Sequence, residues 1–255
     1  MHTKAFPYIG LLSLFWGTNI VVSRFGIGEF DPYWFIAIRL SVAVFFFGLI
    51  FVIQRQPWPT DRQVWQYASL SGIIGVAIPI SLFILSLQYQ SSGITSIFVT
   101  TGPALMVIVA HFVLPDEKMT QNKAVGVILA LSGSLFLVLR GENGLTDTGD
   151  ASLLGFILIT CALCSEVSNT MLVRLRMRDM DIKAVTGIRL LVGASITVVV
   201  AFIVSDFSLS DVTVAGYVSV FYSGVIGALA GQFLSFYITG RFGATAFSLT
   251  TYLIP

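Results

Sequence analysis

Residues 63–115 read QVWQYASLSGIIGVAIPISLFILSLQYQSSGITSIFVTTGPALMVIVAHFVLP, a run of 53 positions without Asp, Glu, Lys or Arg. A bilayer core about 30 Å thick is crossed by about 20 residues of α-helix, so this run is too long for one crossing and fits two. The polar turn QYQSSG at 88–93 is typical of a point where the chain reverses direction. The run therefore predicts a hairpin of two membrane-spanning helices.

Apolar runs of similar length lie on both sides of this hairpin. We expect them to form spans one, two, five, six, seven and eight, over residues 5–23, 32–54, 124–139, 151–173, 184–205 and 212–240. A ninth span begins after Arg241. Because 56% of the residues are apolar and only 11% are charged, lipid is the expected solvent for most of the chain. The fold class predicted is an all-α, polytopic membrane protein without a separate soluble domain.

Basic residues are divided unevenly between the two sets of loops. With a cytoplasmic N-terminus, the inside loops hold ten Lys and Arg residues and the outside loops hold only Arg24 and Arg140. This is the positive-inside pattern, and it predicts a protein of the bacterial cytoplasmic membrane with its N-terminus inside. Loop 142–150 then faces outward. The net charge of +1 gives no basic patch for a nucleic-acid partner.

The two halves of the sequence resemble each other. The matched pairs are Asn19 with Asn169 and Arg39 with Arg189 at a shift of 150, and Ser71 with Ser223, Gly72 with Gly224, Gly75 with Gly227 and Pro103 with Pro255 at a shift of 152. Each half then contains five spans. Because five is an odd number, the second half enters the membrane with the opposite orientation to the first. This predicts the inverted repeat of many secondary transporters, with residues 1–146 as the first repeat and 147–255 as the second.

The repeat makes an expectation about the end of the chain. In the first half, 37 residues separate Pro103 from Arg140 (140 minus 103), whereas the sequence stops at Pro255. We therefore expect the second repeat to be incomplete, truncated in the ninth span. About 37 further residues would finish that span and add a tenth.

These features resemble the drug/metabolite transporter superfamily, and within it the ten-span EamA-type transporters. The residues that carry the resemblance are the signature Trp16, Gly17, Thr18 and Asn19, the pair Arg39 and Leu40, Pro103, and the segment LPDEKM at 114–119. Gly126 and Gly133 match the family's glycine-rich fifth span, whereas Pro115 and Asp116 depart from its usual small-residue or Gly-Glu form. The resemblance implies a carrier of metabolites, amino acids or drugs and leaves the substrate open.

Three charged side chains lie within the predicted spans: Arg39, Glu166 and Arg189. A charge in hydrocarbon is costly, so each is a candidate for handling substrate or protons. The alternatives are a structural ion pair between Glu166 and Arg189, and an Arg39 side chain that reaches to the interface. Trp16 and Asn19 are the expected neighbours of Arg39, with the indole ring in cation–π contact.

Proline or glycine at matching places in the two halves predicts helix breaks around a midplane site. Pro79 in span three corresponds to Gly231 in span eight, as Pro103 corresponds to Pro255. Polar and aromatic side chains near these breaks are candidates to line a solute path, although each is more often a packing residue. The predicted path residues are Trp16, Asn19, Arg39, Pro79, Thr100, Pro103, Glu166, Asn169, Arg189, Tyr222, Gln232, Tyr237 and Tyr252.

His111 and the two cysteines offer weaker signals. A lone histidine near a membrane interface is usually solvated. Cys161 and Cys164 form a C-x-x-C pattern inside a predicted span, where small packing residues are the usual interpretation. We therefore predict no metal and no cofactor.

The favoured function is a secondary-active transporter of small metabolites, either amino acids or related solutes, or drugs, that works by alternating access between the two halves. No ATP-binding motif is present, so an ion gradient is the expected energy source. Glu166 is the sole carboxylate within a span and is the candidate carrier of a coupling proton. The expected partners are a small-molecule substrate and membrane lipid.

Two alternatives stay open at this point. An intramembrane enzyme would need paired aspartates or a Ser–His dyad at depth, and no aspartate lies within a predicted span. A scaffold without transport activity would leave the matched breaks and the buried charges unexplained. We therefore do not predict an enzyme.

Overall fold

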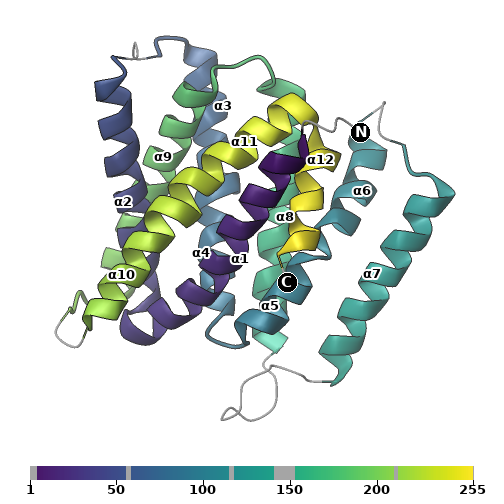
Figure 1. The fold of residues 1–255 in the computed structure, drawn as a ribbon, viewed down its shortest axis with the longest axis horizontal. Coiled ribbons are helices and arrows are strands. Elements are labelled where there is room, and N and C mark those ends of the chain that lie inside the picture. Colours follow the sequence, from purple (N-terminus) through teal and green to yellow (C-terminus); the bar gives the residue numbers. More distant parts are fainter. Residues whose placement is uncertain (1–4, 56–58, 115–117, 141–152, 210–211, 255) are drawn as a thin grey trace.

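The computed structural model describes residues 5–55, 59–114, 118–140, 153–209 and 212–254, and within these ranges the chain is a bundle of helices without a β-strand (Figure 1). Seven helical segments in the described ranges are long and apolar enough to cross a membrane. They are α1 (Phe6–Glu29), α2 (Pro32–Ile53), Arg62–Ser86, Ser92–Val113, α8 (Leu153–Arg176), α9 (Ile182–Val204) and Val214–Phe242. These segments match predicted spans one to four and six to eight, so the all-α, multi-span prediction is confirmed.

Predicted span five is covered by α7 (Gln121–Arg140), which lies at one edge of the bundle beside α6 (Gly102–Val113) (Figure 1). After Arg241 the chain continues as α12 (Ala244–Ser248) and a 3₁₀ turn at Leu249–Leu253, where the ninth span is expected. Several expectations lie outside the described residues: Pro115, Asp116, loop 142–150, the repeat boundary at 146 and 147, and Pro255.

The third span changes its helical geometry just before Pro79. α3 (Arg62–Gly72) passes into a π-helical segment at Ile73–Ala77, called here the first π segment, and α4 (Ile78–Ser86) follows with Pro79 in its first turn. A π turn holds more residues than an α turn, and such turns are frequent at functional sites. The break predicted at Pro79 is thus a change of helix type.

The eighth span has the same construction. α10 (Val214–Tyr222) passes into a second π segment at Ser223–Ala230, and α11 (Gly231–Phe242) follows. The break expected at Gly231 therefore falls where this π segment ends.

The fourth span is interrupted as well. α5 (Ser92–Val99) ends before Thr100, and α6 begins with Pro103 in its first turn. Proline has no backbone N–H, and its ring blocks the carbonyl four residues earlier, so a helix restarts at this position more readily than it continues through it.

Matching residues begin the helices of the two halves. The Asp31 carboxylate accepts a hydrogen bond from the backbone at the start of α2, and Asp181 does the same for α9, 150 positions later (181 minus 31). Asp61 caps α3, and Thr213 caps α10, 152 positions later (213 minus 61). These side chains satisfy backbone donors that a helix start leaves free.

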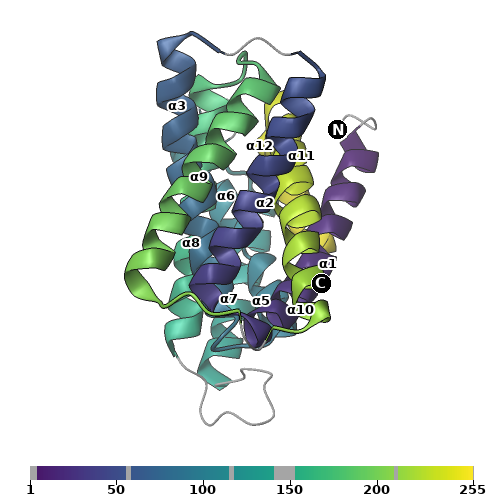
Figure 2. The same ribbon diagram turned by 90° about the vertical axis from the view of Figure 1, so that its left-hand side faces the viewer.

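Glycines allow α2 and α9, which lie side by side at one side of the bundle, to meet the two π-containing spans (Figure 2). A Cβ atom at Gly72 would lie 2.8 Å from the carbonyl oxygen of Arg189, and one at Gly224 would lie 2.7 Å from that of Arg39. Only glycine permits backbones to approach this closely. The contacts fix the backbone of both buried arginines against the π-containing spans.

Candidate functional site

A cavity of about 100 Å³ lies among α1, α2, α4, α8 and α11. Its lining comes from both halves of the sequence. Six of the predicted path residues line it: Trp16, Asn19, Arg39, Pro79, Glu166 and Gln232. Residues that lie more than 200 positions apart in the sequence, such as Trp16 and Gln232, thus face one space.

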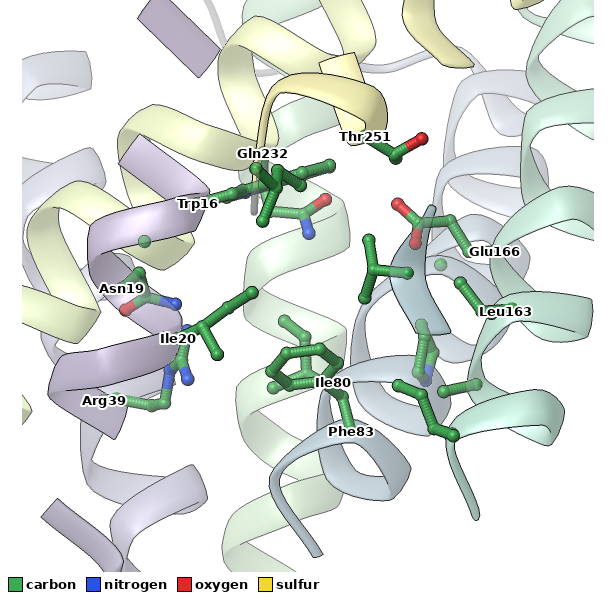
Figure 3. Close-up of a pocket in the computed structure, with 17 residues that line it drawn as sticks. Trp16, Asn19, Ile20, Arg39, Ile80, Phe83, Leu163, Glu166, Gln232 and Thr251 are labelled. Carbon is green, nitrogen blue, oxygen red and sulfur yellow. The ribbon is translucent and has the colours of Figure 1, made fainter. Parts of the chain in front are cut away.

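The two charged residues lie on opposite sides of this cavity. Figure 3 shows Arg39 and Asn19 on the side of α1 and α2, and Glu166 on the side of α8. Ile20, Ile80 and other apolar side chains line the space between them. The cavity therefore offers a cation, a carboxylate and an apolar wall to a solute.

Much of the apolar lining was missed by the sequence analysis. Ile20, Ile80, Phe83, Leu163 and Ile254 all line the cavity. An apolar side chain in a membrane helix carries the same sequence signal whether it faces lipid, the protein core or a cavity. The repeat gives a hint only for Gly75 and Gly227, which are matched glycines and also line it.

Arg39 is 3% exposed, so its side chain is enclosed by the surrounding helices. Its Nη1 atom donates a hydrogen bond of 3.3 Å to Ser23 Oγ, and Nε has no hydrogen-bond partner. The guanidinium carbon lies 5.9 Å from the ring centre of Phe35, one turn earlier on α2. The expected stacking on Trp16 was wrong, because this nearer ring takes that place and the Trp16 ring packs edge-on against Phe247.

Arg189 on α9 is 2% exposed. Its Nη2 atom donates a hydrogen bond of 3.1 Å to Gln232 Oε1, its guanidinium carbon lies 5.5 Å from the ring centre of Phe236, and Nε has no partner. Arg189, Glu166 and Asn169 line a second, smaller cavity of about 10 Å³. The described hydrogen bond of the Arg189 guanidinium goes to Gln232 and not to Glu166.

The matched asparagines lie against the two π segments. Asn169 on α8 packs on Gly75, and its Oδ1 atom accepts a hydrogen bond from Ser71 Oγ. Asn19 on α1 packs on Gly227, but its Oδ1 atom is buried without a hydrogen-bond partner. In each case a Cβ atom on the glycine would overlap the amide group of the asparagine.

The remaining predicted path residues do not line either cavity. Thr100 donates a hydrogen bond to the Ile97 carbonyl of its own span, and Pro103 is buried in the first turn of α6. Tyr222 shares a hydrogen bond with Thr18, and Tyr237 packs on Tyr8. Tyr252 is half exposed. These five side chains therefore stay outside the two cavities.

The weaker sequence signals have simple structural settings. The Nδ1 atom of His111 accepts a hydrogen bond of 3.1 Å from the backbone of Met119. Cys161 and Cys164 are free and exposed on α8, so their interpretation as packing residues was wrong. In the described part of the chain, no group of three His, Cys, Asp or Glu side chains could hold a metal ion.

Comparisons with known proteins agree with this architecture. An uncharacterized transporter of Bacillus subtilis, YoaV, is 25% identical over 250 residues, which cover 97% of this chain and 84% of that protein. A WAT1-related chloroplastic protein of Arabidopsis thaliana is 23% identical over 249 residues, which cover 94% of this chain and 58% of that protein. One solved crystal structure matches the fold with a TM-score of 0.70 at 16% identity, over 100% of this chain and 86% of the other.

A family-level match covers the first half of the molecule. Residues 4–139, more than half of the 255 residues, match the EamA-like transporter family. The expected LPDEKM segment and the two glycines of α7, Gly126 and Gly133, all lie inside the matched range. The chain is an integral, multi-pass membrane protein and belongs to the EamA-like transporter family.

Proposed function

We propose that the protein is a secondary-active transporter of small metabolites and that solute binds in the cavity between Arg39 and Glu166. The observation that carries the proposal is the opposition of these two charges across a space with apolar walls (Figure 3). Buried charges in membrane proteins mark substrate and ion pathways. This arrangement favours a zwitterionic solute, such as an amino acid, with its carboxylate toward Arg39 and its ammonium group toward Glu166.

The proposed mechanism is alternating access between two inverted halves, residues 1–146 and 147–255. Reciprocal contacts support it: Gly72 of the first half meets the Arg189 backbone, and Gly224 of the second half meets the Arg39 backbone. The equivalent N-cap residues and the two π segments support it as well. Inverted repeats place their solute site between the halves, near the membrane midplane.

Glu166 is the proposed carrier of a coupling proton. It lines both cavities, so solute and water can reach it from the larger one while Arg189 faces it across the smaller one. A carboxylate that binds either a proton or the ammonium group of a solute couples the two movements, because the two compete for one site. The proposed setting is a bacterial cytoplasmic membrane with the N-terminus inside.

The test begins with binding. A thermal-shift screen of amino acids, nucleosides and cationic drugs on the purified protein identifies ligands, because a ligand that binds only the folded state raises its stability. Each hit is then assayed for counterflow in proteoliposomes preloaded with unlabelled solute. An alternating-access carrier exchanges external label for internal solute without any ion gradient.

The outcomes separate the possible functions. We expect transient accumulation of label that depends on the preloaded solute, with the solute recovered chemically unchanged. Flux that ignores the preloaded solute would overturn alternating access, and a chemically altered solute would indicate an intramembrane enzyme. Ligands that bind without any flux would overturn the transporter proposal and favour a binding or scaffold role.

A further inference from the structure

The two matched asparagines occupy equivalent settings that differ in their hydrogen bonds. Asn169 packs on Gly75 of the first π segment, and Asn19 packs on Gly227 of the second. All of these contacts cross between the two halves of the sequence. The partner serines are matched too, because Ser71 and Ser223 stand four residues before these glycines.

The contact between α8 and the first π segment is closed. Ser71 Oγ donates a hydrogen bond to Asn169 Oδ1, and neither side chain is exposed beyond 7%. Ser165 on the same face of α8 donates a hydrogen bond of 2.6 Å to the carbonyl of Ile74. This bond satisfies a carbonyl within the π segment and adds a second link between the two elements.

The contact between α1 and the second π segment is open. Ser223 Oγ is 3.4 Å from Ser23 Oγ, which is long for a hydrogen bond between hydroxyl groups. Asn19 Oδ1, the equivalent of the acceptor in the closed contact, is buried and has no partner. A buried acceptor without a donor is costly and rare in native structures, so it calls for an arrangement in which a donor reaches it.

We propose that Ser71–Asn169 and Ser223–Asn19 are two latches that close alternately during the transport cycle. The Ser71–Asn169 latch is closed in this structure, and in the opposite-facing state it opens while Ser223 turns from Ser23 to donate to Asn19. This inference rests on the proposed function, because two inverted halves exchange their conformations when access changes sides. The weak Ser23–Ser223 contact is the bond that the exchange would break.

The test measures which side of the membrane the cavity faces. Ile80→Cys, on the cavity wall, is placed in a protein whose exposed Cys161 and Cys164 are changed to Ala. A membrane-impermeant maleimide then labels this cysteine in intact cells and in inverted vesicles, and the ratio of the two rates reports the balance of states. Ser71→Ala and Ser223→Ala are compared in this background, with Ser86→Ala as the matched control. Ser86 is equally buried but donates only to a carbonyl of its own helix.

We expect Ser71→Ala and Ser223→Ala to shift the labelling ratio in opposite directions, each by about threefold or more, as the loss of one net hydrogen bond implies. Asn169→Ser, which shortens the acceptor of the closed latch, should reproduce the Ser71→Ala shift. The double variant Ser71→Ala/Ser223→Ala should return the ratio toward its starting value. Ser86→Ala should leave it unchanged.

If Ser71→Ala and Ser223→Ala shifted the labelling ratio in the same direction, or by no more than Ser86→Ala does, the proposal of two latches would be overturned. Failure of the inference can be told from failure of the proposed function, because labelling requires no solute. A protein that performs counterflow with unchanged labelling ratios lacks the latches but is a transporter. A protein with opposite labelling shifts but without counterflow changes conformation as inferred and does not carry the solute tested.

Discussion

Arg189 on α9 donates a hydrogen bond of 3.1 Å to the side-chain oxygen of Gln232 on α11. Gln232 is the second residue of α11, two positions after the second π segment ends, and it also lines the larger cavity. The bond therefore joins a buried cation to the span whose geometry changes beside the cavity.

Removal of this acceptor should destabilise the protein. Gln232→Leu leaves the guanidinium without its hydrogen-bond acceptor, and hydrogen bonds to charged groups contribute about 1.5–3 kcal/mol. We expect a loss of about 2 kcal/mol in thermal or denaturant unfolding in lipid nanodiscs. Gln232→Glu keeps an acceptor and should be at least as stable as the unaltered protein. Equal stability of Gln232→Leu would mean that another group takes over the bond.

The glycines that face the two asparagines should not tolerate a side chain. A Cβ atom at Gly75 or Gly227 overlaps the amide of Asn169 or Asn19, and overpacking of this kind costs about 1–3 kcal/mol. Gly75→Ala and Gly227→Ala should therefore unfold at lower temperature. Gly48→Ala is the control, since a Cβ there meets nothing within 4 Å, and alanine favours a helix by about 1 kcal/mol. Similar melting temperatures for all three variants would contradict the packing described here.

Arg39 should select solutes that carry a carboxylate. Arg39 lines the cavity, and its one described side-chain hydrogen bond uses Nη1, so a carboxylate can pair with the other donors of the guanidinium. We expect Arg39→Ala to weaken binding of carboxylate-bearing ligands by about tenfold or more, and of cationic ligands much less. Titration by thermal shift measures both classes on one preparation. A uniform loss for cations and carboxylates would indicate a structural role.

Glu166 should be needed for coupling and not for exchange. Glu166→Gln preserves the shape of the side chain but removes its ability to bind and release a proton. Uptake driven by a pH gradient in proteoliposomes is therefore expected to disappear, while counterflow of the same solute persists at higher solute concentration, because the neutral amide binds the ammonium group more weakly. Full gradient-driven uptake by this variant would rule out Glu166 as the proton carrier.

The positions of the helices were readable from the sequence because lipid imposes a length on each span. Proline and glycine marked the places where those helices change geometry, as at Pro79 and Gly231. Buried charge was readable for a similar reason, since Arg39 and Arg189 are too costly in hydrocarbon to lie there without a partner.

Side-chain direction around each helix was not readable. Tyr237 and Tyr252 stand near the predicted breaks, yet neither lines either of the two cavities described above, whereas Ile80 and Phe83 line the larger one. The partner of Arg39 was missed for the same reason, because Phe35 is one turn away on the same helix and the packing of α1 determines where the Trp16 ring lies. Such choices depend on contacts between helices, which leave no periodic signal in a sequence that is apolar on every face.

The π segments in spans three and eight hold more residues per turn than the α-helical parts of these spans. An α-helix advances by about 100° per residue, so if a π turn tightened to α geometry, every side chain beyond it would rotate by about that amount. For the third span, the rotation would turn the Ile80 side chain away from the cavity while the turns of α3 before the π segment stayed packed on α9. A helix of this kind can change the lining of a binding site by swivelling in place, with its two ends still held at the membrane surfaces.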